Sequence, residues 1–359
     1  MPFLPRVPRR PAARSLARLG IGLLALALAA CDRSGGAVYQ QQFFAFGTLV
    51  DVTIYGADTA LAQKATDAAE QDFHRMHRAW HAWHPSDLTR TNHRLATGRA
   101  FKAPASVLAL IRRSRVLARR SDGLFDPAVG KLLALWGFES DTPPSGPPPD
   151  PARIKALVAA HPSMEDIEVR GDRVRCTNPA VQLDFGAFAK GYGVDQVIEH
   201  LRRLGIRNAI VDAGGDLRAI GRHGDRPWRI GIRAPRGPGV LASVEVSGDQ
   251  SVFTSGDYER YFMYKGKRYH HILDPRTGYP ARGTVSVTVI DPDAAVADAA
   301  ATALFVAGPK QWVTIARRMG IHYVMLVDDQ GTVHMNPAMA KRIHFETDKA
   351  PKVVLSPSL

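Results

Sequence analysis

Strand-type segments fill the middle of this 359-residue chain, and helical patterns lie on either side of them. Residues 44–55 alternate and are rich in Thr and Val, which predicts a strand, and several strand-like runs lie within residues 228–273. Short strands are predicted at 208–212 and 285–290. Helical patterns cover residues 59–83, 106–121, 190–204, 294–306 and 309–319. This arrangement predicts an α+β fold.

Prolines and glycines mark several connections between these elements. Residues 142–149 contain five prolines and cannot form regular structure, so we expect an exposed loop there. Asp150 and Pro151 then supply the cap and the first-turn proline of a helix. Residues 167–176 predict a hairpin that turns at a Gly-Asp pair.

The first thirty residues are not expected to belong to the fold. Five arginines precede an apolar run over residues 21–30, which is too short to cross a bilayer as a stable helix. The run ends in small residues just before Cys31, which indicates a lipoprotein signal with cleavage and lipidation at that cysteine. The alternative is an ordinary secretory signal followed by an incidental cysteine. Asp32 resembles the residue that retains some bacterial lipoproteins, so we expect a lipid anchor on the periplasmic side of the inner membrane.

Removal of residues 1–30 lowers the formal net charge from +13 to +8 and leaves enough chain to bury a sizeable core. A charge of this size suits contact with anionic lipid or an anionic ligand. The basic residues are scattered and form no arginine-rich tract, so nucleic acid is not an expected partner. Cys176 is the one other cysteine, which excludes an intramolecular disulfide framework and a thiolate metal site.

Four glycine-containing segments each join regular elements. Glycine lets backbone amides approach a ligand closely, and a helix beginning near Lys190 would aim its amino end at phosphates. One such segment alone is usually a turn, but four in one chain favour a ligand site. Known phosphate-loop sequences are missing, and the kinase-like Asp-Phe-Gly at 184–186 lacks the other kinase motifs. The segments are residues 122–127, 184–191, 212–216 and 271–278.

Asp298 and Thr302 lie one turn apart on the same face of an alanine-rich helix. A carboxylate and a hydroxyl are hard oxygen donors, which suit Mg²⁺ holding phosphates rather than zinc. The alternative is a capping aspartate and a solvated threonine, and the spacing by itself favours that alternative.

Four histidines recur at helical spacing, and two or more of them could bind a transition metal. No carboxylate or cysteine completes the set at this spacing, and two tryptophans interleave with the histidines, so a partly exposed amphipathic face is the favoured interpretation. These histidines are His74, His77, His81 and His84.

His271 begins a motif that is dense in turn residues. An imidazole of near-neutral pKa can take a proton from a hydroxyl nucleophile. The residue could equally serve only to order the Asp-Pro turn that follows, and the sequence pattern does not decide between the two roles.

Together these motifs resemble the ApbE family of FAD:protein FMN transferases. In chain order they are residues 47–48 (Gly-Thr), 123–127 (Gly-Leu-Phe-Asp-Pro), 135–138 (Leu-Trp-Gly-Phe), 184–191 (Asp-Phe-Gly-Ala-Phe-Ala-Lys-Gly), 214–216 (Gly-Gly-Asp), 255–258 (Ser-Gly-Asp-Tyr), 271–278 (His-Ile-Leu-Asp-Pro-Arg-Thr-Gly) and 297–302 (Ala-Asp-Ala-Ala-Ala-Thr). The resemblance implies mixed or antiparallel sheets flanked by helices. It also implies a tether at 31–42, a flavin transferase domain at 43–350 and a tail at 351–359.

The resemblance implies roles for individual residues. Mg²⁺ would be held by the Ala187 carbonyl, the Asp298 carboxylate and the Thr302 hydroxyl, and His271 would be the base for the acceptor threonine. The residues implied to contact FAD or to line its site are Asp122, Gly123, Leu124, Asp184, Lys190 and Ile272.

Two positions depart from the family pattern. Phe46 stands where a methionine commonly precedes Gly-Thr, and Trp83 ends a His-Ala-Trp run where a Ser-Thr-Tyr tract is usual. Both replacements keep an apolar or aromatic surface, so Phe46 and Trp83 are expected to pack on the flavin or adenine rings.

The implied activity is Mg²⁺-dependent transfer of FMN from FAD, the substrate, to a threonine of an acceptor protein as a phosphoester, with release of AMP. One rival is a Mg²⁺-dependent FAD pyrophosphatase, in which water replaces the threonine. Another is a non-catalytic FAD-binding lipoprotein. The implied acceptors are threonine-containing flavoprotein subunits of membrane or periplasmic redox enzymes. This chain has no acceptor-like threonine tract, so we expect it to modify other proteins.

Overall fold

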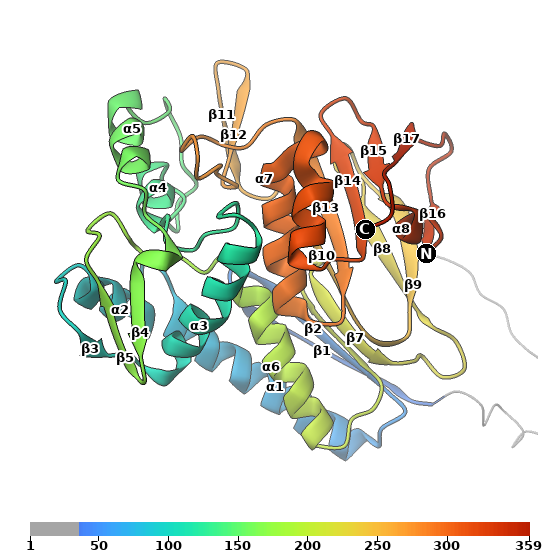
Figure 1. Cartoon of the computed structure of the whole chain (residues 1–359). Coiled ribbons are helices and arrows are strands. Elements are labelled where there is room, and N and C mark those ends of the chain that lie inside the picture. The colour runs from blue at the N-terminus through green and yellow to red at the C-terminus, as the bar shows by residue number, and fades with distance from the viewer. Residues whose placement is uncertain (1–35) are drawn as a thin grey trace, which may run out of the picture. The chain divides into compact units, whose positions relative to one another are not determined.

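A nine-stranded sheet organises the part of the chain that the structure, a computed structural model, describes, residues 36–359 (Figure 1). Neighbouring strands are antiparallel, except that the last two are parallel. The mixed sheet and its flanking helices confirm the predicted α+β class. In spatial order the strands are β1 (Val38–Ala45), β2 (Thr48–Tyr55), β6 (Ala209–Ala213), β7 (Leu217–Gly221), β10 (Gly248–Gly256), β13 (Thr284–Asp291), β14 (Tyr323–Asp328), β15 (Val333–Met335) and β17 (Val353–Leu355).

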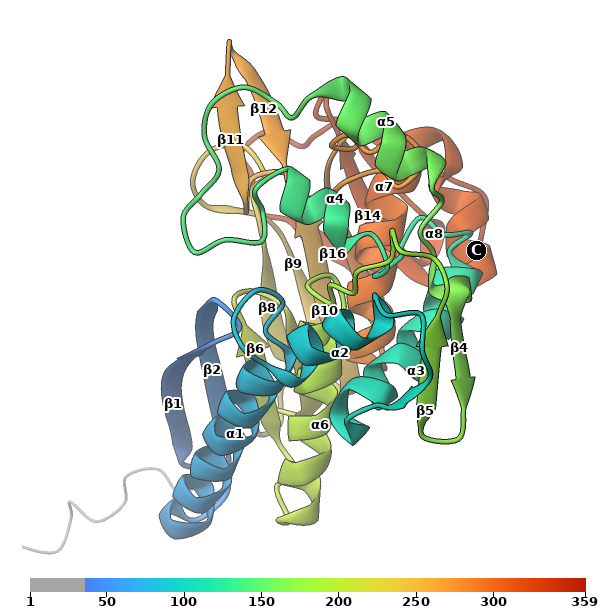
Figure 2. The same cartoon turned by 90° about the vertical axis from the view of Figure 1, so that its left-hand side faces the viewer.

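Helices cover one face of this sheet and bury its largest apolar cluster (Figures 1 and 2). Helix α7 packs across β10 and β13, α6 lies on β6 and β7, and α1 lies on β1 and β2. Because α7 and a second layer cover β13 on both faces, seven of its eight residues are buried. The helices are α1 (Thr59–Trp80), α3 (Ala105–Arg120), α6 (Ala189–Arg203) and α7 (Ala294–Met319).

A smaller sheet and a short helix cover the opposite face. Trp228 and Ile230 of this sheet share an apolar cluster with Leu217, Val252 and Met325 of the large sheet. The central strands β13 and β14 therefore contribute residues to two separate cores, one on each face of the sheet. The elements of this layer are β8 (Trp228–Arg233), β9 (Val240–Val246), β16 (Ile343–Phe345) and α8 (Pro337–Ala340).

A hairpin of β11 (Tyr261–Tyr264) and β12 (Lys267–His270) stands out from the body of the fold (Figures 1 and 2). Its inner face packs with Trp136 and Phe138 in a third apolar cluster. The remaining elements are α2 (Asp87–Leu95), α4 (Gly130–Leu135), α5 (Pro151–Ala159), the 3₁₀ turn Met164–Asp166, and a small sheet of β3 (Phe101–Lys102), β4 (Ile167–Arg170) and β5 (Arg173–Cys176).

Several predicted elements are confirmed. Asp150 caps α5 by accepting from the Ala152 amide at 2.9 Å, and β4 and β5 form the hairpin predicted at 167–176. The two helices predicted at 294–306 and 309–319 are the halves of α7. They are separated by a kink at Gly308, whose φ of 69° and ψ of 179° interrupt the helix before Pro309.

Three boundary predictions are wrong. The single strand predicted at 44–55 is the β1–β2 hairpin, which turns at Phe46 (φ 52°) and Gly47 (φ 75°), because a left-handed Phe is not a recognisable turn signal. The tether predicted at 31–42 is already strand β1 from Val38 onward. The tail predicted at 351–359 contains β17, which pairs with β15 and so belongs to the fold.

The predicted signal sequence, with Cys31 and Asp32, lies outside the described residues. Within residues 36–359, no helix is long and apolar enough to cross a membrane.

Candidate active site

Helices α6 and α7 meet at a glycine that permits close approach. A Cβ atom on Gly191 would collide with the backbone oxygen of Ala294 and lie 2.9 Å from the Cβ of Asp298. Instead, the Gly191 amide donates to Asp298 Oδ2 at 2.9 Å. This amide belongs to the first turn of α6, which has no carbonyl partner within its own helix. The crossing therefore fixes the Asp298 carboxylate at the amino end of α6.

Lys190 joins this crossing to the central sheet. Its ammonium forms an ion pair with Asp216, a buried residue in the turn between β6 and β7, and Asp216 Oδ1 accepts from the Thr254 amide of β10 at 2.8 Å. Burial opposes the charge on Lys190, but the carboxylates of Asp216 and Asp298 outweigh it and raise the pKa of Lys190. The lysine is therefore cationic at neutral pH.

Hydroxyl groups complete this side of the site. Thr302 lies one turn after Asp298 on α7, and its Oγ1 is 3.2 Å from the Ser255 Oγ of β10. Thr302 is partly exposed, whereas Asp298 is 5 % exposed. Ala187 lies in the turn that leads into α6, three residues before Lys190. Carboxylate and hydroxyl oxygens from three elements thus gather beside the ammonium, and we call Lys190, Asp216, Ser255, Asp298 and Thr302 the oxygen side of the site.

The charges of the oxygen side fit a hard divalent cation. Two buried carboxylates, Asp216 and Asp298, share the single ammonium of Lys190. Burial, reinforced by Asp216 and opposed by Lys190, raises the pKa of Asp298 above its usual range. A buried carboxylate with surplus negative charge around it would be stabilised by a cation, and the donors present are the oxygens that Mg²⁺ prefers.

His271 is held in one tautomer by the base of the β11–β12 hairpin. The backbone carbonyl of Arg260 lies 3.0 Å from the His271 amide and 3.1 Å from its Nδ1. A carbonyl can only accept, so Nδ1 carries the proton and Nε2 keeps its lone pair. Burial and the Arg260 guanidinium lower the pKa of His271 to about 3, and Lys190 adds to this effect. The imidazole is therefore neutral at physiological pH.

Arg260 also lies beside two aromatic residues, Trp83 and Phe138. Its guanidinium lies 5.8 Å from the centre of the Trp83 ring and donates to the Phe138 carbonyl. Phe138 in turn meets the His271 ring edge-on, with centroids 6.2 Å apart. We call Trp83, Glu139, Asp184, Arg260 and His271 the loop side of the site, because each lies outside the helices and strands.

Two acids lie beside Arg260. Glu139 Oε2 accepts from the side-chain amide of Gln182 at 2.7 Å, while its buried Oε1 has no hydrogen-bond partner among the described residues. Burial and the nearby Asp184 raise the pKa of Glu139 to about 8. Burial likewise raises the pKa of Asp184, whose Oδ1 accepts from the Gly186 amide at 2.7 Å. The Arg260 guanidinium offsets only part of this effect of burial for both carboxyls.

The remaining predicted site residues lie around this core. Asp122 and Gly123 form the left-handed end of α3, with φ of 61° and 74°, and Asp122 pairs with Arg318 at 3.0 Å. Leu124 is buried. This segment reaches the site through Pro127, whose carbonyl accepts from the Asp184 amide at 2.9 Å.

The side chains of Ile272 and Phe46 both pack against other residues of the protein. The Ile272 side chain is buried, and its carbonyl accepts from the Ala281 amide at 2.9 Å. Phe46 stacks on Trp80 with centroids 6.0 Å apart and planes 7° apart. Phe46 remains partly exposed, so one part of its ring surface is open to a ligand.

Sequence reasoning did not single out Asp216, Ser255, Glu139 or Arg260 as site residues. Asp216 and Ser255 belong to motifs quoted for the resemblance, so their signal was present. Glu139 directly follows the Leu-Trp-Gly-Phe motif, and Arg260 follows Ser-Gly-Asp-Tyr by two residues. These residues come together only in the folded chain. Arg260 and Phe138, for example, are in contact although they are more than a hundred residues apart in the sequence.

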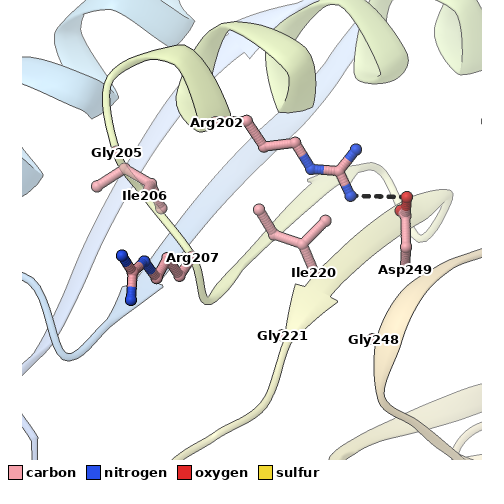
Figure 3. A pocket seen from close by; sticks show the side chains of 8 residues that line it. All are labelled: Arg202, Gly205, Ile206, Arg207, Ile220, Gly221, Gly248 and Asp249. Atoms are coloured by element: carbon pink, nitrogen blue, oxygen red, sulfur yellow. Dashed lines mark ion pairs between the residues drawn. The ribbon is translucent and has the colours of Figure 1, made fainter.

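A surface hollow of about 560 Å³ lies at the other end of α6 (Figure 3). Arg202 and Arg207 line it, and its one carboxylate, Asp249, pairs with Arg202 at 2.6 Å. None of the predicted site residues lines this hollow. The oxygen and loop sides, rather than this hollow, hold the reactive groups.

The sequence profile of the ApbE family matches residues 46–325, which is more than half of the chain. The chain belongs to the ApbE family. An ApbE relative from Rhodobacter capsulatus, an FAD:protein FMN transferase, is 44 % identical over 303 residues, which are 84 % of this chain and 58 % of that protein. The chain thus spans little more than half the length of that relative.

Other ApbE proteins match along nearly their whole length. The FAD:protein FMN transferase of Klebsiella pneumoniae is 32 % identical over 325 residues, covering 87 % of this chain and 95 % of that protein. The crystal structure of the flavinyl transferase ApbE from Pseudomonas stutzeri superimposes with a TM-score of 0.76 at 32 % identity, covering 89 % of this chain and all of that one. The fold described above is therefore the ApbE fold.

Proposed function

We propose that this chain is a FAD:protein FMN transferase that uses Mg²⁺ and modifies a threonine of an acceptor protein. The threonine oxygen forms a bond to the FMN-side phosphorus of FAD. The bond from that phosphorus to the bridging oxygen breaks, and AMP leaves with the electron pair. The observation that carries the proposal is the oxygen side itself, where the Asp298 carboxylate and the Thr302 hydroxyl of α7 meet the amino end of α6 and the Lys190–Asp216 ion pair.

The oxygen side supplies charge for the pyrophosphate of FAD. Mg²⁺ held by Asp298, Thr302 and the Ala187 carbonyl would neutralise phosphate charge as a Lewis acid. Lys190 keeps its ammonium because Asp216 and Asp298 raise its pKa. That ammonium offsets the charge that develops on the departing AMP. Asp216 orients the ammonium through its ion pair and is itself fixed by the Thr254 amide.

His271 is suited to take the proton of the acceptor threonine. Its Nδ1 proton is engaged by the Arg260 carbonyl, so Nε2 is the nitrogen that can accept. Burial keeps the imidazole neutral in the absence of substrate. When FAD is bound, the negative charge of its phosphate groups would stabilise a proton at Nε2. The imidazole would then be able to hold the proton that it takes from the threonine.

The loop side is proposed to bind the flavin. Trp83 offers an aromatic surface beside Arg260, and Phe46 offers a second one next to Trp80. Asp184, Ile272 and the Asp122–Leu124 turn are proposed to line the rest of the nucleotide site. The names of the relatives, FAD:protein FMN transferases, support FAD as the substrate.

The test is incubation of the full chain with FAD, Mg²⁺ and a recombinant acceptor domain that contains a candidate threonine. Mass spectrometry of the acceptor should find an added FMN on threonine, and chromatography should find one AMP for each FMN attached. Free FMN with no modified acceptor would identify a pyrophosphatase instead. FAD binding without AMP release would identify a binding protein. An EDTA-treated sample is the matched control.

We also propose that the chain acts at the periplasmic face of the inner membrane, attached through a lipidated Cys31. The support is the arginine-rich start, the short apolar run and the small residues before that cysteine. The proposed acceptors are flavoprotein subunits of membrane or periplasmic redox enzymes. Radiolabelled palmitate should label the wild-type chain in bacteria but not Cys31→Ser, and the variant should leave the membrane fraction.

A further inference from the structure

A second group of metal-ligand side chains lies where α1 ends. His81 and His84 follow α1, and Asp141 follows α4. No carboxylate adjoins these histidines in the sequence, but folding brings Asp141 to them across 57 residues. One ligand atom from each of the three residues lies within 4.8 Å of the other two. His84 Nε2 is 2.8 Å from Asp141 Oδ2, and the two imidazole rings have centroids 4.3 Å apart.

Only part of the histidine stripe takes part in this cluster. His77 Nδ1 accepts from the Phe46 amide at 3.2 Å, and His74 Nε2 lies 3.2 Å from the Phe44 carbonyl. The rings of these two histidines therefore contact the backbone of the β1–β2 hairpin. His81 and His84 face Asp141 instead, so the fold separates the stripe into a structural pair and a pair that meets a carboxylate.

The donor set differs in kind from the oxygen side of the active site. Two imidazoles and one carboxylate suit Zn²⁺, Co²⁺ or Ni²⁺, whereas the Asp298 and Thr302 oxygens suit Mg²⁺. His84 and Asp141 are exposed, so an ion can reach them from solvent.

Residues around the cluster also hold its ligands in place, as they do in known metal sites. The Trp83 indole donates to Asp141 Oδ1 at 2.9 Å and so orients the carboxylate from behind. The present partners of His81 Nδ1 are the backbone amides of His84 and Trp83, at 3.1 and 3.4 Å. A metal ion at Nδ1 would replace these two hydrogen bonds, whereas an ion at Nε2 would leave them in place.

We propose that His81, His84 and Asp141 bind one divalent transition-metal ion of the zinc class, independently of the Mg²⁺ proposed for the active site. The bound ion joins the end of α1 to the loop that carries Asp141. Because Trp83 lies between the two histidines and hydrogen-bonds to Asp141, the ion also fixes Trp83 beside Arg260.

The experiment measures Co²⁺ binding to the tag-free full chain, with millimolar Mg²⁺ present to occupy the oxygen side. One Co²⁺ per chain should bind, with visible ligand-field absorption, and Zn²⁺ should displace it. His84→Ala and Asp141→Asn should each weaken binding by about 10–100-fold. His93→Ala, which removes an exposed histidine of α2, is the matched control and should bind like wild type.

A second readout uses the tryptophan. Ni²⁺ should quench the fraction of tryptophan fluorescence that Trp83→Phe removes, and this quenching should be lost in Asp141→Asn. The proposal is overturned if Co²⁺ does not bind in Mg²⁺, or if His84→Ala and Asp141→Asn bind as tightly as His93→Ala. Neither measurement uses FAD or an acceptor, so its failure is separate from a failure of the proposed transferase activity.

Discussion

The two sides of the site are built in different ways. The oxygen side stands mainly on regular elements: Lys190 on α6, Asp298 and Thr302 on α7, and Ser255 on β10. The loop side has no such support, and Trp83, Glu139, Arg260 and His271 are held by one another and by the base of the β11–β12 hairpin. The first arrangement holds charges at fixed positions. The second places its groups on loops, where the packing of one loop on another sets their positions.

This difference separates what a substitution should do on each side. A change on the oxygen side removes charge that acts on the pyrophosphate and leaves the flavin contacts in place. A change on the loop side affects either proton transfer or the contacts that hold the flavin. Measurements that separate FAD binding from turnover therefore test whether the two sides act as described.

The largest effect is expected for His271→Ala. Removal of the proposed base should lower the rate of FMN transfer by about 10²–10⁴-fold, while FAD still binds. Stopped-flow or quench measurements of AMP release, with FAD affinity from fluorescence titration, would check this. Loss of FAD binding together with turnover would instead show that His271 orders the 271–278 turn. His93→Ala, on the exposed surface of α2, serves as the control.

Asp298→Asn should have the next largest effect, about 10²–10³-fold on turnover. The amide keeps the size of the side chain and can still accept from the Gly191 amide through its oxygen, but it loses the charge that would hold Mg²⁺. Raising the Mg²⁺ concentration should recover part of the activity. Thr302→Ser is the matched control, because it keeps the hydroxyl beside Ser255. Equal losses in both variants would argue against a cation at this position.

Part of the oxygen side, though not Asp216 or Ser255, was accessible to sequence reasoning because its spacing is local. Asp298 and Thr302 are four residues apart on one helix, and Lys190 starts another, so periodicity alone places each side chain on a known element. The confirmed start of α5 has the same origin, because its capping Asp150 and its first-turn Pro151 are neighbours in sequence.

On the loop side, Trp83, Asp184 and His271 were also named from the sequence, but Glu139 and Arg260 were not. Arg260 meets Phe138 across 122 residues, and Asp141 meets Trp83 across 58. No local pattern encodes such contacts, since they depend on how α4, the proline-rich loop and the β11–β12 hairpin pack together. The β1–β2 turn was missed for a different reason. Phe46 adopts a left-handed conformation that its packing on Trp80 and Phe73 must stabilise, and that packing is also long-range.

Gly191→Ala tests how rigid the oxygen side is. The new Cβ would collide with the Ala294 backbone oxygen and crowd Asp298, so α6 and α7 would have to move apart. We expect a loss of about 1–3 kcal/mol in the free energy of unfolding, seen as a lower Tm, together with weaker Mg²⁺ dependence of turnover. Gly231→Ala is the control, because its Cβ would meet Val240 at an ordinary 3.5 Å. An unchanged Tm would mean that the helix crossing is adaptable.

The smallest effect is expected for Glu139→Gln, and it concerns the pH dependence of stability. Burial raises the pKa of Glu139 from 4.5 to about 8, so between these values the unfolded chain ionises this carboxyl while the folded chain keeps its proton. The folded wild-type protein therefore loses stability as pH rises through this window. The glutamine variant has no such loss, because its side chain does not ionise. Glu139 is partly exposed, which reduces the effect. We therefore expect the Tm of the variant minus the Tm of wild type to increase by roughly 2–4 °C between pH 4.5 and pH 8. Burial of the amide itself does not vary with pH, so the change with pH isolates ionisation. A Tm difference that stays constant would mean that Arg260 already compensates the ionised Glu139, and the loop side would then be as well balanced electrostatically as the oxygen side.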